Sequence, residues 1–203
     1  PNHSIINVPD KRINILNELV NPEKTIPATV EIVDIAGLVK GASKGEGLGN
    51  KFLANIRETD AIIHVLRCFD DDNIAHVDGS VDPVRDKEII DIELQLKDLE
   101  TVVNRLEKVK KTSKSGDKSS IEELGILEKV VSHLESSRNI RSISGEIKKK
   151  VHILKPLQLL TSKPVLYVCN VDEKSVIDGN NYVSSVMNLA EKENAQVISL
   201  AAG

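Results

Sequence analysis

Apolar residues along this chain recur with two periods, one typical of β-strands and the other typical of α-helices. Short apolar runs of the strand type are separated by segments with helical spacing, both before residue 87 and after residue 155. Strands are expected at 3–8, 29–35, 61–66, 164–169 and 196–200, and helices at 11–20, 50–60 and 182–194. Strands that alternate with helices in this way predict a doubly wound α/β sheet.

Apolar residues in the middle of the chain follow a heptad spacing instead, with steps of four and three residues. This spacing predicts two helical seams, at Ile92, Leu96, Leu99, Val103 and Leu106 and at Leu124, Leu127, Val131 and Leu134. The polar stretch 111–120, which contains Gly116, predicts a turn between them. Two such helices pack as an antiparallel coiled-coil hairpin, which we expect at 87–155 as an insertion in the sheet domain. A short helix at 146–151 is expected to return the chain to that domain.

Composition indicates a globular protein with an ordinary core. The 203 residues are 40% hydrophobic, and no apolar run approaches the roughly 18 residues of a membrane-spanning helix. No signal peptide is recognisable, so we expect a cytoplasmic protein. Cys68 and Cys169 both end apolar runs, where a buried and reduced thiol is the usual state. The net charge of −4 argues against bulk electrostatic attraction to nucleic acid.

The strand at 29–35 runs into the first motif that carries chemistry, Asp34-x-x-Gly37, and then into a glycine-rich stretch. An Asp at the carboxyl end of a strand in a phosphate-binding α/β domain is placed to hold a magnesium-bound water. Gly37 has no side chain to obstruct a backbone N–H that approaches a terminal phosphate. Strands followed by Asp and a glycine turn occur in many folds, so this motif alone favours an ordinary turn.

A second motif, Asn170-Val171-Asp172-Glu173, follows the strand at 164–169. It is close to the Asn-Lys-x-Asp sequence with which GTPases read guanine, and the Asn170 amide offers a donor and an acceptor to a base edge. Val171 replaces the lysine and Glu173 replaces the aspartate, so the guanine clamp is altered. Asn and Asp also favour plain strand-ending turns, but the two motifs in this order favour a nucleotide site over a plain turn.

The runs DIAGLVKGASKGEGLGNKFLANIRETDAI and HVLRCFDDDNIAHV closely resemble the Obg-like ATPases of the YchF family, among the translation-factor-related P-loop NTPases. The resemblance covers essentially the whole chain. It implies a P-loop NTPase fold of the G-domain type with an inserted coiled-coil hairpin, and it implies binding of Mg²⁺ with ATP at least as well as GTP. The residues that it assigns to the nucleotide are Gly37, Asn170, Val171, Glu173 and Ala201, with Asp34 holding the metal through water.

The resemblance also bears on catalysis. GTPases of the Ras type place a glutamine near Asp-x-x-Gly to orient the attacking water, but here Leu38 follows Gly37 and cannot hydrogen-bond water. The family places a catalytic histidine in the loop that here contains His76. From the residues alone, a histidine in this acidic loop is better explained as a solvated side chain. With the resemblance included, the catalytic and the solvated interpretations of His76 have equal weight. His64 lies within an apolar strand and is expected to be a packed core residue.

Two parts of the family are missing from this sequence. It contains no Gly-x-x-x-x-Gly-Lys-Ser/Thr phosphate loop, and the C-terminal TGS domain of the family does not occur in it. We therefore expect an internal fragment that by itself binds nucleotide poorly and hydrolyses it hardly at all. On this interpretation residues 1–86 are the first part of the nucleotide-binding domain, 87–155 the coiled-coil insertion and 156–203 the base-recognition part.

Exposed lysines suggest where a partner would bind. Lys108, Lys110, Lys111, Lys114 and Lys118 crowd the tip of the expected hairpin. They fit a solvated helix tip, but the resemblance implies association with the ribosome, and a basic tip on a projecting arm suits contact with RNA phosphates. Two other functions remain open, a GTP-specific GTPase of the Obg class and a coiled-coil scaffold that hydrolyses nothing.

Overall fold

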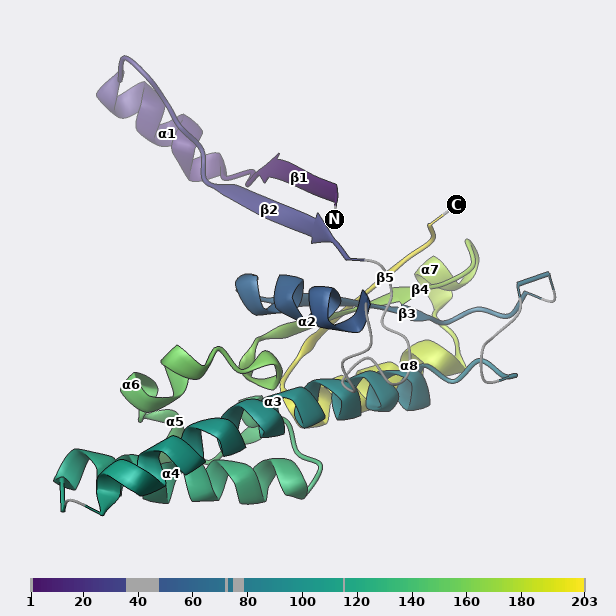
Figure 1. The fold of residues 1–203 in the computed structure, drawn as a ribbon. Coiled ribbons are helices and arrows are strands. Elements are labelled where there is room, and N and C mark those ends of the chain that lie inside the picture. The colour runs from purple at the N-terminus through teal and green to yellow at the C-terminus, as the bar shows by residue number, and fades with distance from the viewer. Residues whose placement is uncertain (1, 36–47, 72, 75–78, 115, 203) are drawn as a thin grey trace. The chain divides into compact units, whose positions relative to one another are not determined.

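The structure is a computed structural model and falls into two compact units, Pro1–Gly37 and Leu38–Gly203 (Figure 1). The residues that the structure describes are 2–35, 48–71, 73–74, 79–114 and 116–202.

The first unit is a β-α-β element. Strands β1 (Asn2–Asn7) and β2 (Thr29–Asp34) pair antiparallel, and helix α1 (Lys11–Val20) lies between them in the sequence. The helix begins after Asp10, whose carboxylate accepts a hydrogen bond from the backbone N–H of Arg12 at 2.9 Å. These elements confirm the strands and the helix predicted for this part of the chain.

The second unit contains a parallel sheet in the order β3-β4-β5. Its strands are β3 (Ile62–Arg67), β4 (Val165–Asn170) and β5 (Gln196–Leu200). Because the strands are parallel, their carboxyl ends lie at one edge of the sheet, where nucleotide-binding α/β domains bind their ligands. The predicted alternation of strands and helices is confirmed here.

Helix α8 (Asn181–Glu193) covers one face of this sheet. It begins after Asn180, whose side chain accepts from the backbone N–H of Val183, and it ends at Asn194 with a left-handed φ of 53°. The core beneath the helix is made of Leu66, Cys68, Tyr167, Cys169, Val171, Val183, Val186 and Ala190. Both cysteines are buried and free, as predicted.

Helix α2 (Leu48–Glu58) precedes β3, and its side chains Leu53 and Ile56 are buried. Within the described residues, no helix is long and apolar enough to cross a membrane.

The predicted hairpin is formed by helices α3 (Pro83–Ser113) and α4 (Lys118–Glu135), which run side by side (Figure 1). Asp82 caps the start of α3 and Asp117 caps the start of α4. The buried residues of the hairpin core are Val102, Leu106, Val109, Leu127, Val130 and Leu134. Gly116, in the turn between the helices, has a φ of 80°, which is a conformation that favours glycine.

The predicted seam on α3 is wrong at three of its five positions, Ile92, Leu96 and Val103. Ile92 and Leu96 are 49% and 46% exposed, and Val103 is 36% exposed. The buried stripe of this helix starts instead with polar residues, namely Lys87, Asp91, Gln95 and Asp98. Hydrophobic spacing cannot detect a core-facing stripe of charged residues, so it selected the apolar stripe beside it.

The charged residues at the base of α3 are paired across several elements. Lys87 lies 2.7 Å from Asp91 and also contacts Glu193 of α8, and Asp91 accepts from Asn139 at 2.7 Å and from Arg141 at 3.2 Å. This network ties the hairpin to the sheet domain.

The chain returns from the hairpin through short helices, η2 (Ile140–Ser142), α5 (Gly145–Lys148), α6 (Val151–Leu154), η3 (Lys155–Leu157) and η4 (Leu160–Ser162). The single helix predicted at 146–151 is wrong, because the chain bends between α5 and α6 at Lys149 and Lys150. A further short helix, α7 (Ser175–Asp178), precedes α8.

Candidate nucleotide-binding site

The carboxyl end of β4 carries the side chain with the most specific geometry. The Oδ1 atom of Asn170 accepts a hydrogen bond from the backbone N–H of Ala202 at 3.1 Å. An amide oxygen has two lone pairs, so Oδ1 retains one, and among the described residues none accepts from Nδ2. Asn170 is thus held in orientation and still offers a donor and an acceptor side by side, the pattern that matches an adenine edge.

Backbone contacts join β4 to the segment after β5. The N–H of Val171 donates to the carbonyl of Leu200 at 3.0 Å, and the Val171 side chain is buried in the core under α8. Ala201 lies directly between Leu200 and Ala202, so the structure brings Asn170, Val171 and Ala201 together. Val171 therefore contributes backbone and packing here, whereas the lysine found at this position in GTPases is a long polar side chain.

The rest of the second motif is a tight turn. The Asp172 carboxylate accepts from the N–H groups of Lys174 and Ser175 at 3.1 and 3.0 Å and from the Ser175 hydroxyl at 2.7 Å. These hydrogen bonds, the hydroxyl first, lower the pKa of Asp172. Asp172 and Glu173 are both exposed, but Asp172 is occupied by the turn, so Glu173 is the carboxylate of this motif that the turn does not use.

The neighbouring strand end is held by a residue that the sequence did not point to. Asn180 donates from Nδ2 to the carbonyl of Cys68 at 2.8 Å, and its oxygen caps α8. The N–H of Cys68 in turn donates to the Asn170 carbonyl at 2.8 Å. The hydrogen bond with Cys169, followed by burial, raises the pKa of the Cys68 thiol, and both thiols are completely buried. The one sequence feature that could have identified Asn180 is its position, as a polar residue at the N-cap of a predicted helix.

The first motif lies in the other unit. Asp34 is the last residue of β2, pairs in register with Asn2, and is exposed. Gly37, Leu38 and His76 lie outside the described residues.

Magnesium is the metal that the fold family implies, and the donor set fits it in kind. Mg²⁺ in nucleotide sites is held by one or two carboxylates together with phosphate oxygens and water. The Asp34 carboxylate is exposed at the end of its strand and is such a donor. The described residues hold no group of three or more His, Cys, Asp or Glu that would bind a metal without a nucleotide.

Comparison with known proteins agrees with this fold. A family model described as "50S ribosome-binding GTPase" matches residues 8–108. The solved structure of the Schizosaccharomyces pombe YchF GTPase superposes with a TM-score of 0.81 at 39% identity, covering 99% of this chain and 55% of that one. A parallel sheet with a motif of the base-reading type at its carboxyl edge, together with this match, defines a P-loop NTPase fold of the G-domain type.

The sequence is also similar to that of curated proteins that share one name. The chain is 50% identical over 202 residues to "Ribosome-binding ATPase YchF" of Haemophilus ducreyi, covering 100% of this chain and 55% of that protein. It is 52% identical over 204 residues to the protein of the same name from Bacillus subtilis, covering 100% and 56%. The chain is similar to these YchF proteins along its whole length and spans about half of theirs.

Proposed function

We propose that the intact protein containing this chain is a cytoplasmic nucleoside triphosphatase that binds and hydrolyses ATP with Mg²⁺, accepts GTP as well, and acts as a switch on the ribosome. The orientation of Asn170 carries this proposal. Its amide is fixed by Ala202 so that a donor and an acceptor remain for a base edge, and Glu173 stands where GTPases have the guanine-reading aspartate. The names of the relatives, which are called ribosome-binding ATPases, support it.

The remaining residues have roles that follow from their chemistry. Asp34 would hold Mg²⁺ through water, and the backbone at Gly37 would approach the terminal phosphate. When bound, Mg²⁺ supplies charge neutralisation at the phosphates. Leu38 cannot orient water, so we assign to His76 the orientation of the attacking water. Asn170, Val171, Glu173 and Ala201 would form the base site: Asn170 and Glu173 by side chain, the other two by backbone.

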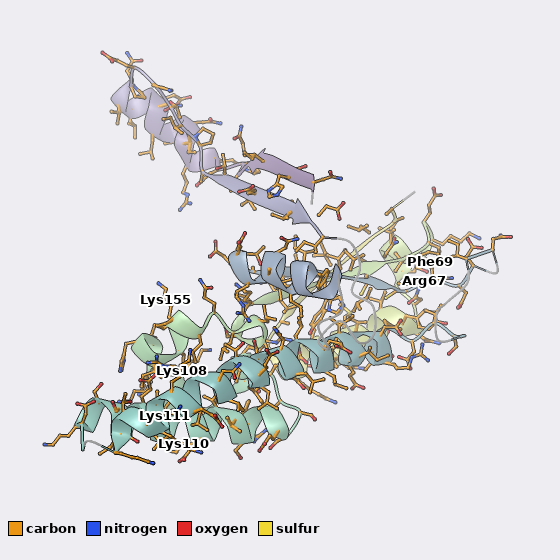
Figure 2. All side chains as sticks on the ribbon, viewed as in Figure 1. Arg67, Phe69, Lys108, Lys110, Lys111 and Lys155 are labelled. Carbon is orange, nitrogen blue, oxygen red and sulfur yellow. The ribbon has the colours of Figure 1, made fainter. Side chains whose placement is uncertain are left out.

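A partner site is proposed at the hairpin tip. Lys108, Lys110 and Lys111 are exposed on the last turns of α3, and Figure 2 shows them along that end of the arm. Lys114 and Lys118 add two more exposed charges at the turn into α4. Clustered lysines on a projecting arm favour contact with the phosphates of ribosomal RNA.

Equilibrium titration of the full-length protein tests the nucleotide site. ATP and GTP compete for it in the presence of Mg²⁺, and we expect binding of both with a preference for ATP. Asn170→Ala should weaken ATP binding about tenfold, because a base edge loses its paired hydrogen bonds. Asn104→Ala, on the exposed side of α3, is the matched control and should bind like the wild type.

Two other results of this titration would favour the two alternative functions. A strong preference for GTP would mean that Glu173 reads guanine as an aspartate does, and the protein would be a GTP-specific GTPase. Failure to bind either nucleotide would leave a coiled-coil scaffold.

A further inference from the structure

Arg67, the last residue of β3, binds three backbone carbonyls of the segment that follows it. Its Nε donates to Phe69 O at 3.1 Å, its Nη2 to Asp71 O at 3.2 Å and its Nη1 to Ile74 O at 3.0 Å. The guanidinium also lies over the Phe69 ring, 4.9 Å from the centroid, and Figure 2 shows the two side chains together at the end of the sheet. A single side chain thus fixes the carbonyls of three residues.

The chemistry of the guanidinium makes this arrangement specific to arginine. Arginine carries five N–H donors in one rigid plane, so its three nitrogens reach three acceptors spread around one loop. A lysine keeps the charge but has one nitrogen, and cannot span the carbonyls of Phe69 and Ile74 at once. The described residues of the loop also make local hydrogen bonds, from Ile74 N to Asp71 O at 3.1 Å and from Asn73 N and Nδ2 to Asp71 Oδ1 at 2.8 and 3.0 Å.

The place of this clamp connects it to the candidate site. Arg67 is the register partner of Asn170, so the segment 69–74 starts at the carboxyl edge where the proposed base-reading side chain lies. From the other side, Tyr182 donates to the Asp70 carboxylate at 2.9 and 3.1 Å. The same segment leads in sequence to His76, two residues after Ile74.

We propose that Arg67 is a positioning residue for nucleotide hydrolysis, which acts by holding the backbone of Phe69, Asp71 and Ile74 at the carboxyl edge of the sheet. This inference rests on the proposed function. The three guanidinium nitrogens of Arg67 donate to carbonyls of its own loop, so Arg67 acts through the residues that follow it. Its loss should therefore lower the turnover number and leave the affinity for ATP unchanged.

A double-mutant cycle in the full-length protein tests this, with wild type, Arg67→Lys, His76→Ala and the double variant. Arg67→Lys should lower kcat for ATP about tenfold or more, with KM within about twofold, because a misplaced catalytic loop costs rate and not binding. The double variant should turn over no more slowly than His76→Ala alone, since both changes remove one function. Arg105→Lys, whose arginine pairs with Glu123 on the hairpin, is the matched control and should keep the wild-type kcat.

Hydrogen–deuterium exchange supplies a readout besides activity. Peptides covering 69–74 should exchange faster in Arg67→Lys than in wild type, while peptides from β4 and α8 keep their protection. An unchanged kcat in Arg67→Lys overturns the proposal, even if exchange rises, and so does a raised KM with unchanged kcat. The proposal also fails if the losses of kcat in the two single variants multiply in the double variant. If wild type binds ATP but does not turn it over, the proposed function fails instead, before Arg67 is tested.

Discussion

At the scale of single residues, several buried polar side chains are placed by donors far away in the sequence. Asp98 of α3 is completely buried and accepts from the N–H groups of Leu160 and Thr161, at 2.7 and 2.8 Å, and from the Thr161 hydroxyl at 2.7 Å. Burial raises the pKa of this carboxyl, while the three hydrogen bonds oppose that rise. Asp98 thereby fixes the start of η4 to the hairpin.

His64 gives a prediction for pH dependence. Its ring lies in β3, 6.0 Å from the Tyr167 ring between centroids, and burial lowers its pKa. The folded state therefore binds a proton less readily than the unfolded chain, whose histidines titrate near about 6.5. The stabilising effect is complete above that value and is lost as pH falls through it towards the lowered folded pKa.

We expect the free energy of unfolding to fall between about pH 7.5 and pH 5.5, with at most about 1.4 kcal/mol per pH unit from this group. Urea unfolding at several pH values measures the slope. His64→Gln should reduce it, and His152→Gln, at an exposed position on α6, should not. Equal slopes in wild type and His64→Gln would show that His64 is not the group responsible.

At the scale of elements, α3 packs in two different ways along its length. Its first half lies against α8 and β3 through the charged residues Lys87 and Asp91, and its second half packs against α4 through Val102, Leu106 and Val109. Paired buried charges at the base give geometric specificity more than stability. The apolar seam further out supplies the stabilising burial of the hairpin.

The seam can be tested by comparing two leucines that the heptad spacing treats alike. Leu127→Ala removes a completely buried side chain and should lower the free energy of unfolding by about 2–5 kcal/mol. Leu96→Ala, at a position 46% exposed, should cost less than about 1 kcal/mol. Denaturant unfolding followed by helical circular dichroism gives both values. A cost at Leu96 equal to that at Leu127 would restore the predicted seam.

At the scale of the whole molecule, charge is unevenly distributed. The chain carries a net charge of −4, yet its hairpin ends in the five exposed lysines described above. An acidic protein is repelled from nucleic acid in general, so any contact with ribosomal RNA would be concentrated where the arm projects.

Substituting Lys108, Lys110 and Lys111 by Gln should weaken association of the full-length protein with ribosomal particles. The slope of log K against log salt should become shallower by about two to three, because each phosphate contact releases close to one counterion. Binding measured across a range of salt gives the slope. A control with the same change in charge replaces the exposed Lys11, Lys174 and Lys192, and an equal effect there would exclude a specific role for the tip.

Local pattern alone predicted most of the elements. The helix at 11–20 and the strand at 196–200 agree with the structure residue for residue, because amphipathic spacing and their capping and turn residues are local properties. The Asn170 motif was also recognisable, since strand-ending polar residues stand out from an apolar run. Neither pattern could show that Asn170 is oriented by Ala202, which lies 32 residues away.

The sequence by itself determined the alternation of elements, the presence of a helical hairpin and the chemistry of the two motifs. Each of these depends on residues that are close together in the sequence. The tertiary structure alone decided which stripe of α3 is buried and which carbonyls Arg67 binds. Lys87 is buried between Asp91, one helical turn away, and Glu193, 106 residues later in the sequence. Burial of a charge depends on the partner that folding brings to it, and no local period contains that information.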